Sequence, residues 1–189
     1  MKTLLIFPPP ASPVSPYLSI PLLCGQLENA GFDATCMDLS VEFFNHILSY
    51  DFLERAYYKA VSQIEVLSKT VKADLNMQMD EFNLLPKSDQ INILRLNALL
   101  RIPSKEDFLN IGNNIKNDVL AYKDNDIFYD VKKIKKHSDN ILRAFKLAML
   151  PYFPAQCMFH SYNNKLFNLN YKDIKYQVED INNNVFYEF

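Results

Sequence analysis

Residues 2–7, KTLLIF, lead directly into three prolines at positions 8–10, and an apolar segment opening with SIPLL follows from Ser19. The first stretch has the length and residue types of a strand buried on both faces, as in a parallel sheet. Consecutive prolines cannot donate hydrogen bonds to a sheet, so the chain must leave the sheet after residue 7. The sequence therefore predicts a buried strand followed by a stiff loop.

A helix and a second strand are predicted after this loop. Pro21 suits the first turn of a helix, where its missing N–H is not needed. Gly31 suits the left-handed cap that ends a helix. A strand over 34–37 follows, with Asp38 at its carboxyl end. Strand, loop, helix and strand in this order begin a doubly wound α/β sheet.

The carboxyl edge of this sheet is the predicted ligand-binding site, because doubly wound sheets bind ligands beyond the carboxyl ends of their strands. Two alternatives stay open at this point. The proline-rich loop either lines a pocket or forms a rigid surface, and Asp38 either binds a ligand or caps the next helix. The predicted cofactor-binding residues are Pro8, Pro9, Pro10, Ser12, Ser15, Ser19 and Asp38.

After residue 40 the pattern becomes helical. Apolar residues recur at helical spacing over 41–50, with Ser40 as the N-cap, and further helices are expected over 52–71 and 127–150. Ser104 and Asp107 resemble a capping box.

Near the C-terminus, two short strands are expected around a turn at Asn163-Asn164. Asn170 is placed to cap a helix over 171–181. The predicted fold is helix-dominated α/β: the β-α-β start of a Rossmann-like parallel sheet, a large helical insertion and a short C-terminal hairpin. The predicted domains are 1–39, the α/β start; 40–150, the helical insertion; and 151–189, the short strands with a helix.

Composition restricts the class of protein. The 189 residues carry a formal charge of −2, which argues against a nucleic-acid surface. No apolar run approaches the length of a membrane span, and the three scattered cysteines indicate buried thiols in a reducing compartment. We therefore expect a cytoplasmic protein.

Other candidate sites favour ordinary structural roles. Glu42 and His46 are four residues apart and are interpreted as an exposed pair, and His137 and His160 as isolated residues. The lysines over 132–136 follow several aspartates closely, which favours a solvated helix face over a phosphate-binding patch. No metal site is expected, and the chain has no glycine-rich phosphate loop.

Three segments resemble the N-terminal, cobalamin-binding-like region of B12-type radical SAM proteins, most closely members associated with peptide maturation. The likeness lies in the order of strand, proline loop, SIP helix start, Gly31 and DLSVEFF. The segments are LLIFPPPASPVSPYLSIPLLCGQLENAGFDATCMDLSVEFF at 4–44, the helical region after it, and FPAQCMFHSYNNKLFNLNYKDI at 153–174 leading into NNNVFYEF at 182–189.

This chain departs from the family pattern in three ways. The first loop has no Asp-x-His-x-x-Gly histidine ligand for cobalt, as in many radical SAM relatives. The later strands with Gly-rich turns are missing, and so is the Cys-x3-Cys-x2-Cys motif that leaves one iron of a cluster open to SAM. The resemblance thus implies the front of such an enzyme, truncated before the radical SAM domain. It implies cobalamin in the full-length protein, with the iron–sulfur cluster and SAM only in the missing part.

The expected function is an accessory cofactor- or substrate-binding module of a cobalamin-dependent radical SAM enzyme, not catalytic alone. Its expected partners are the remainder of the enzyme, on the same or a separate chain, and a peptide substrate. Neither nucleic acid nor a membrane is expected. The alternative is a helical peptide- or protein-interaction module with a small α/β start.

Overall fold

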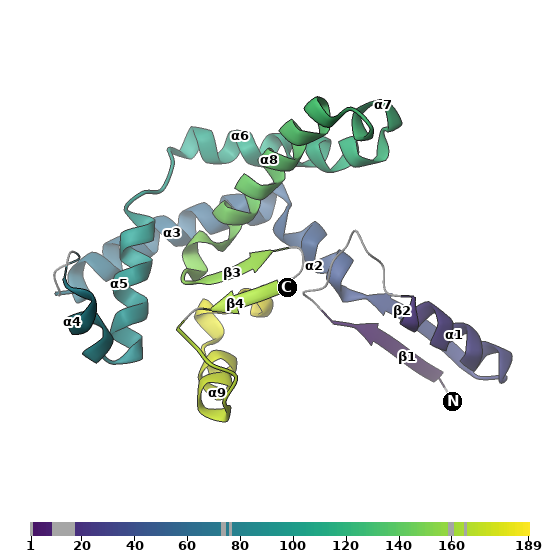
Figure 1. Ribbon diagram of the computed structural model, residues 1–189, viewed down its shortest axis with the longest axis horizontal. Helices are drawn as coiled ribbons and strands as arrows, with labels where there is room; N and C mark the ends of the chain where they lie inside the picture. Colours follow the sequence, from purple (N-terminus) through teal and green to yellow (C-terminus); the bar gives the residue numbers. More distant parts are fainter. Residues whose placement is uncertain (1, 9–17, 73–74, 76, 159–160, 165) are drawn as a thin grey trace. The chain divides into compact units, whose positions relative to one another are not determined.

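The computed structural model describes residues 2–8, 18–72, 75, 77–158, 161–164 and 166–189 (Figure 1). Contacts divide the chain into a sheet unit, residues 1–46 with 157–162, and a helical unit, residues 47–156 with 163–189. Helices dominate, as predicted. The strands in the described residues form one parallel pair and one C-terminal hairpin.

The sheet unit contains the predicted strand, helix and strand. β1 (Lys2–Phe7) and β2 (Asp33–Asp38) pair in parallel, and α1 (Ser19–Asn29) lies between them in the sequence and packs on both. Pro21 lies in the first turn of α1, and Gly31 has a φ of 84°, the left-handed conformation that glycine adopts without strain. These local predictions are confirmed.

The prediction that β1 is buried on both faces is wrong. Leu4 and Ile6 are 55% and 46% exposed, and Met37, opposite Ile6 in the register, is 46% exposed. Successive side chains of a strand point to opposite faces, and α1 covers only the face that carries Cys36. Among the described residues this sheet consists of two parallel strands with α1 on one side.

The helices expected over 41–50 and 52–71 are both present, with shifted ends. α2 (Leu39–Ile47) begins before Ser40, so the prediction that Ser40 is its N-cap is wrong. A separate helix, α3 (Tyr50–Thr70), starts after Ser49, whose hydroxyl oxygen accepts a hydrogen bond from the Phe52 amide at 3.2 Å.

The helical unit contains α3 and the helical elements that follow it in the chain. Its further helical elements are α4 (Met79–Leu84), α5 (Lys87–Leu99), α6 (Lys105–Leu120), η1 (Ala121–Lys123), α7 (Asn125–Phe128), α8 (Val131–Met149), η2 (Leu150–Tyr152), α9 (Tyr171–Glu179), η3 (Ile181–Asn183) and η4 (Val185–Tyr187).

Side-chain caps set several of these boundaries. Asp130 accepts hydrogen bonds from two amides at the start of α8, which separates α7 from α8 where one helix over 127–150 was predicted. The Ser104 hydroxyl oxygen accepts from the Asp107 amide at 3.2 Å, as expected at an N-cap. The Asp107 carboxylate receives the Ser104 hydroxyl at 2.6 Å, so the pair is only half of a capping box.

The core of the helical unit lies where α3, α6 and α8 pack together. Phe52, Phe108 and Phe145 are each no more than 1% exposed there. A Cβ at Gly112 of α6 would lie 3.3 Å from Cδ2 of Tyr50, so glycine allows the two helices to approach closely. A second cluster, between α3 and α5, contains Ala60, Leu67, Leu96 and Leu99.

The C-terminal hairpin differs in detail from its prediction. β3 (Ala155–Met158) and β4 (Ser161–Asn164) form it, so Asn163 and Asn164 belong to a strand and not to the turn. Beyond α9, the chain continues as the short 3₁₀ helices η3 and η4. Among the described residues, no helix is both long and apolar enough to span a bilayer.

Candidate functional site

The predicted site is described only in part. Register places Phe7 opposite Asp38, so both strands reach the same carboxyl edge, and Pro8 follows there as an exposed residue. Ser19 is the exposed first residue of α1. Four of the predicted residues, Pro9, Pro10, Ser12 and Ser15, lie outside the described residues.

Asp38 is used as a helix cap. Its Oδ1 accepts hydrogen bonds from the Ser40 amide at 2.9 Å and the Val41 amide at 3.2 Å. These amides belong to the first turn of α2, where backbone donors have no partner inside the helix. The geometry therefore favours the capping alternative for Asp38 over a ligand contact.

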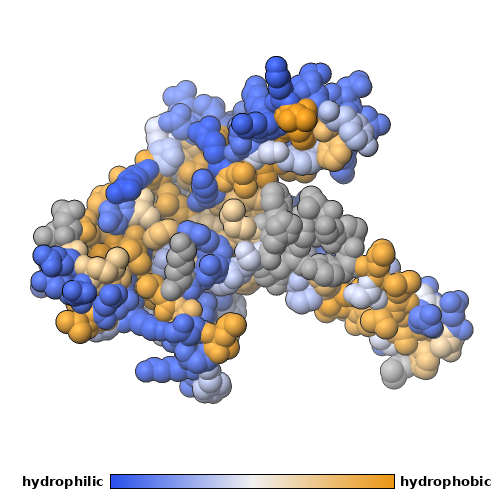
Figure 2. All heavy atoms as spheres, in the orientation of Figure 1, coloured by the Kyte–Doolittle hydropathy of each residue, from blue (hydrophilic) through white to orange (hydrophobic). Residues whose placement is uncertain are grey.

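The face of β1 and β2 opposite α1 is the most distinctive surface of the sheet unit. Leu4, Ile6 and Met37 lie on it, and Figure 2 shows hydrophobic residues at the surface of this unit. Parallel sheets in proteins are almost always covered on both faces. No third strand pairs with β1 or β2 among the residues that the structure describes. Because this face is apolar and exposed, it is a candidate packing surface for additional strands or helices.

The cysteines are only partly as predicted. Cys24 and Cys157 are buried, but Cys36 is exposed. Cys36 lies against α1, with its thiol 3.7 Å from the Ile20 carbonyl oxygen. A hydrogen bond with Cys36, together with desolvation, raises the pKa of the Cys24 thiol to about 11, and burial raises the pKa of Cys157 to about 12. Cys24 and Cys157 are therefore held as thiols at neutral pH.

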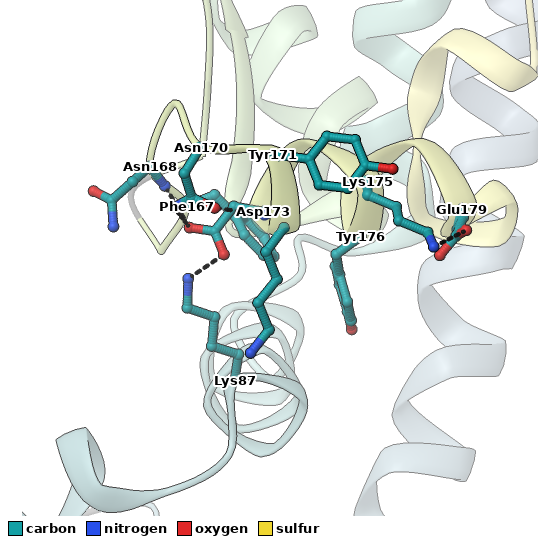
Figure 3. Close-up of a pocket in the computed structure, with 10 residues that line it drawn as sticks. Lys87, Phe167, Asn168, Asn170, Tyr171, Asp173, Lys175, Tyr176 and Glu179 are labelled. Atoms are coloured by element: carbon teal, nitrogen blue, oxygen red, sulfur yellow. Dashed lines mark hydrogen bonds and ion pairs between the residues drawn. The ribbon is translucent and has the colours of Figure 1, made fainter.

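A hollow beside α9 is the second candidate site (Figure 3). Its volume is about 710 Å³, within the range of small-molecule sites. The rings of Phe167 and Tyr176 stack in it at 5.3 Å between centroids. Its lining combines aromatic, basic and acidic side chains: Lys87, Phe167, Asn168, Asn170, Tyr171, Lys172, Asp173, Lys175, Tyr176 and Glu179.

Asp173 organises one end of this hollow. Its Oδ1 accepts from Lys87 Nζ at 2.8 Å, and its Oδ2 accepts from the Asn168 amide and from Asn170 Nδ2, both at 2.9 Å. Asn170 Oδ1 in turn accepts from the Asp173 amide, which confirms Asn170 as the cap of α9. The Lys87 ammonium and the Asn168 amide lower the pKa of Asp173 to about 2.

Because the pKa of Asp173 is lowered, we expect the contact between α9 and Lys87 of α5 to weaken in acid. A carboxyl whose pKa falls on folding stabilises the native state above its unfolded pKa, and this stabilisation disappears as pH falls through the folded pKa. Stability should therefore decrease between pH 3.8 and about 2 as Asp173 gains its proton. Amide hydrogen exchange of α9 across this interval measures the effect. The Asp173→Asn variant should exchange faster at neutral pH and lack the acid step; an unchanged step would contradict the assignment.

A buried polar cluster between α6 and α8 could not be expected from sequence. Asp118 is only 4% exposed, and its Oδ1 lies 2.7 Å from His137 Nδ1 and accepts from Asn140 Nδ2 at 3.2 Å. The interpretation of His137 as isolated is therefore wrong. Asp118 and His137 are 19 positions apart, and only the packing of α6 on α8 brings them together.

Two further expectations concern charge and metals. The lysines over 132–136 are exposed along α8, as a solvated helix face requires. Asp124 and Asp130 cap the starts of α7 and α8, which explains the aspartates beside these lysines. No group of three metal-ligating side chains occurs within the described ranges.

Comparison with known proteins identifies no family for this chain. The chain matches no protein-family model, and no curated protein or solved structure has significant similarity to it.

Proposed function

We propose that this chain is an accessory, binding-type module: the front of the cobalamin-binding α/β domain of a cobalamin-dependent radical SAM enzyme. Further polypeptide, on the same chain or a separate one, completes the sheet and carries the catalytic centre. Cobalamin binds only to the completed domain, without a histidine ligand from the first loop, and the enzyme acts on a peptide.

The observation that carries this proposal is the exposed apolar face of β1 and β2, on which no helix or strand of the described residues packs. Two parallel strands with one helix bury too little surface for independent stability, and their outer face is apolar where solvent requires polar residues. Leu4, Ile6 and Met37 become buried if strands and helices of a larger α/β domain are added. The link to cobalamin and radical SAM chemistry comes from the resemblance of residues 4–44.

The first test is cobalamin binding by this chain alone. Hydroxocobalamin titrated into the purified chain should change its visible spectrum little, because the crevice of a doubly wound sheet needs strands on both sides of the switch point. Tight stoichiometric binding would overturn the proposal that further polypeptide is required.

The second test is assembly with the catalytic part. A polypeptide with the Cys-x3-Cys-x2-Cys motif, encoded downstream of or beside this chain, should co-purify with it, and the complex should retain cobalamin. Ile6→Asp, which places a charge on the open face, should abolish co-purification. Leu84→Asp, at an exposed residue of α4, is the matched control and should leave it unchanged. Absence of such a polypeptide, or equal behaviour of both variants, would contradict the proposal.

The hollow beside α9 favours a second candidate, a peptide-interaction module. Stacked Phe167 and Tyr176 offer an apolar surface, and Lys172 an ammonium group, which together fit a peptide with an acidic residue beside an aromatic or aliphatic one. Fluorescence anisotropy of labelled acidic peptides tests it: Tyr176→Ala and Lys172→Ala should both weaken binding, and Lys132→Ala on α8 should not.

A further inference from the structure

α9 carries an apolar stripe on its solvent side. Tyr171, Ile174 and Val178 follow one another at intervals of three and four residues, the spacing of one helix face. They are 81%, 46% and 54% exposed, and Ile181, just beyond the helix, is also exposed. The buried residue of this helix is instead a carboxylate, Asp173. The usual arrangement of a surface helix, apolar inward and charged outward, is therefore inverted here.

The charges of α9 are also distributed against the preference of an isolated helix. Apart from Asp173 in the first turn, which is buried and bound to Lys87, the charged residues are Lys172 near the N-terminus, Lys175 at the middle, and Glu179 and Asp180 at the C-terminal end. A helix favours acidic groups near its N-terminus and basic groups near its C-terminus, so Lys172, Glu179 and Asp180 are near the less favourable ends. Within the helix, Lys175 Nζ approaches Glu179 at 3.6 Å, but both side chains are more than half exposed, so this pair contributes little.

If α9 of a second copy packs antiparallel against α9, the charges that are unfavourable within one helix become favourable between the two. In such a pair, the lysines of one helix run beside Glu179 of the second copy, and each acidic end lies next to the positive N-terminus of the other helix. With the twofold axis at the level of residue 176, whose own ring faces Phe167 on the other side of the helix, Ile174 lies opposite Val178 of the second copy, and Tyr171 opposite Ile181. The same flank of the stripe meets itself, as an isologous interface requires.

We infer that the outer face of α9 is a self-association surface that pairs antiparallel with α9 of a second copy of this chain. Apolar contacts between the two stripes supply most of the affinity, and the lysine–glutamate contacts set the antiparallel direction. The interface is small, so the dimer is weak and forms as chain concentration rises. This inference concerns the helical unit and does not depend on the proposed function of the sheet unit.

Sedimentation equilibrium over a wide range of chain concentrations tests the association. The wild-type chain should pass from monomer to dimer. Ile174→Asp should weaken dimerisation by more than about tenfold, because every substitution occurs twice in a symmetric pair. Val178→Asp should act in the same way, and Val131→Asp, at an exposed residue of α8, is the matched control and should have no effect. Circular dichroism identifies any variant that has lost helical structure. Such a variant is excluded, and another substitution in the stripe is used in its place.

A charge swap tests the direction of pairing. The Lys172→Glu/Lys175→Glu variant and the Glu179→Lys variant should each dimerise more weakly than wild type, because like charges then meet. An equimolar mixture of the two variants should restore association as a heterodimer, less so at high salt. The inference would be overturned if the wild-type chain stayed monomeric at all concentrations, or if the mixture did not form dimers. Another segment or partner would then cover the stripe.

Discussion

Phe108→Ala is expected to lower the free energy of unfolding of the helical unit by about 3–5 kcal/mol. The Phe108 side chain is 0% exposed and belongs to α6 in the three-helix core. Its ring packs edge-on against Tyr57, with 5.3 Å between centroids, so truncation removes an aromatic contact and leaves a cavity. This loss is a large fraction of the total stability of a typical domain.

Urea denaturation followed by circular dichroism measures this effect. Leu84→Ala is the control, because Leu84 is 86% exposed at the end of α4 and its truncation should change stability by no more than about 0.5 kcal/mol. Similar midpoints for the two variants would mean that α3, α6 and α8 do not share the core described above.

Local sequence signals located much of this fold. Gly31 ends α1 because a left-handed residue is needed there, and Asn170 starts α9 because its side chain accepts from an amide three residues later. Such signals depend on residues a few positions apart, so they are readable without tertiary contacts. They also predicted β1 over residues 2–7, where the structure has it.

Several predictions that depended on distant residues failed, although the parallel pairing of β1 with β2 was correct. The apolar run of β1 has the residue types of a strand buried on both faces, but burial depends on which elements cover it, and only α1 does so in the described residues. The dipeptide Asn163-Asn164 is a common turn signal, yet pairing of β3 with β4 places it in a strand. Lys87 and Asp173 meet across 86 positions, which no local pattern reports.

His137→Leu is expected to lower the free energy of unfolding by about 2 kcal/mol, the cost of leaving a buried polar group without a partner. Asp118 is buried, and its Oδ2 has no hydrogen-bond partner among the described residues, so the carboxylate depends on the contacts of Oδ1. Removing the imidazole leaves Asn140 as the remaining hydrogen-bond partner of this buried oxygen among the described residues. Leaving a buried polar group without its hydrogen-bond partner costs about 1–3 kcal/mol, and the 24% exposure of the His137 side chain keeps the loss within this range.

A double-mutant cycle separates this pairing from simple packing. Asp118→Leu alone should also destabilise, because His137 Nδ1 and Asn140 Nδ2 then lose their acceptor. The double variant Asp118→Leu/His137→Leu removes both polar groups and replaces them with apolar side chains, so it should be more stable than the sum of the single effects predicts, by about 1–3 kcal/mol. Simple additivity in urea denaturation would show that the two residues act independently, and that α6 and α8 are joined by their apolar faces alone.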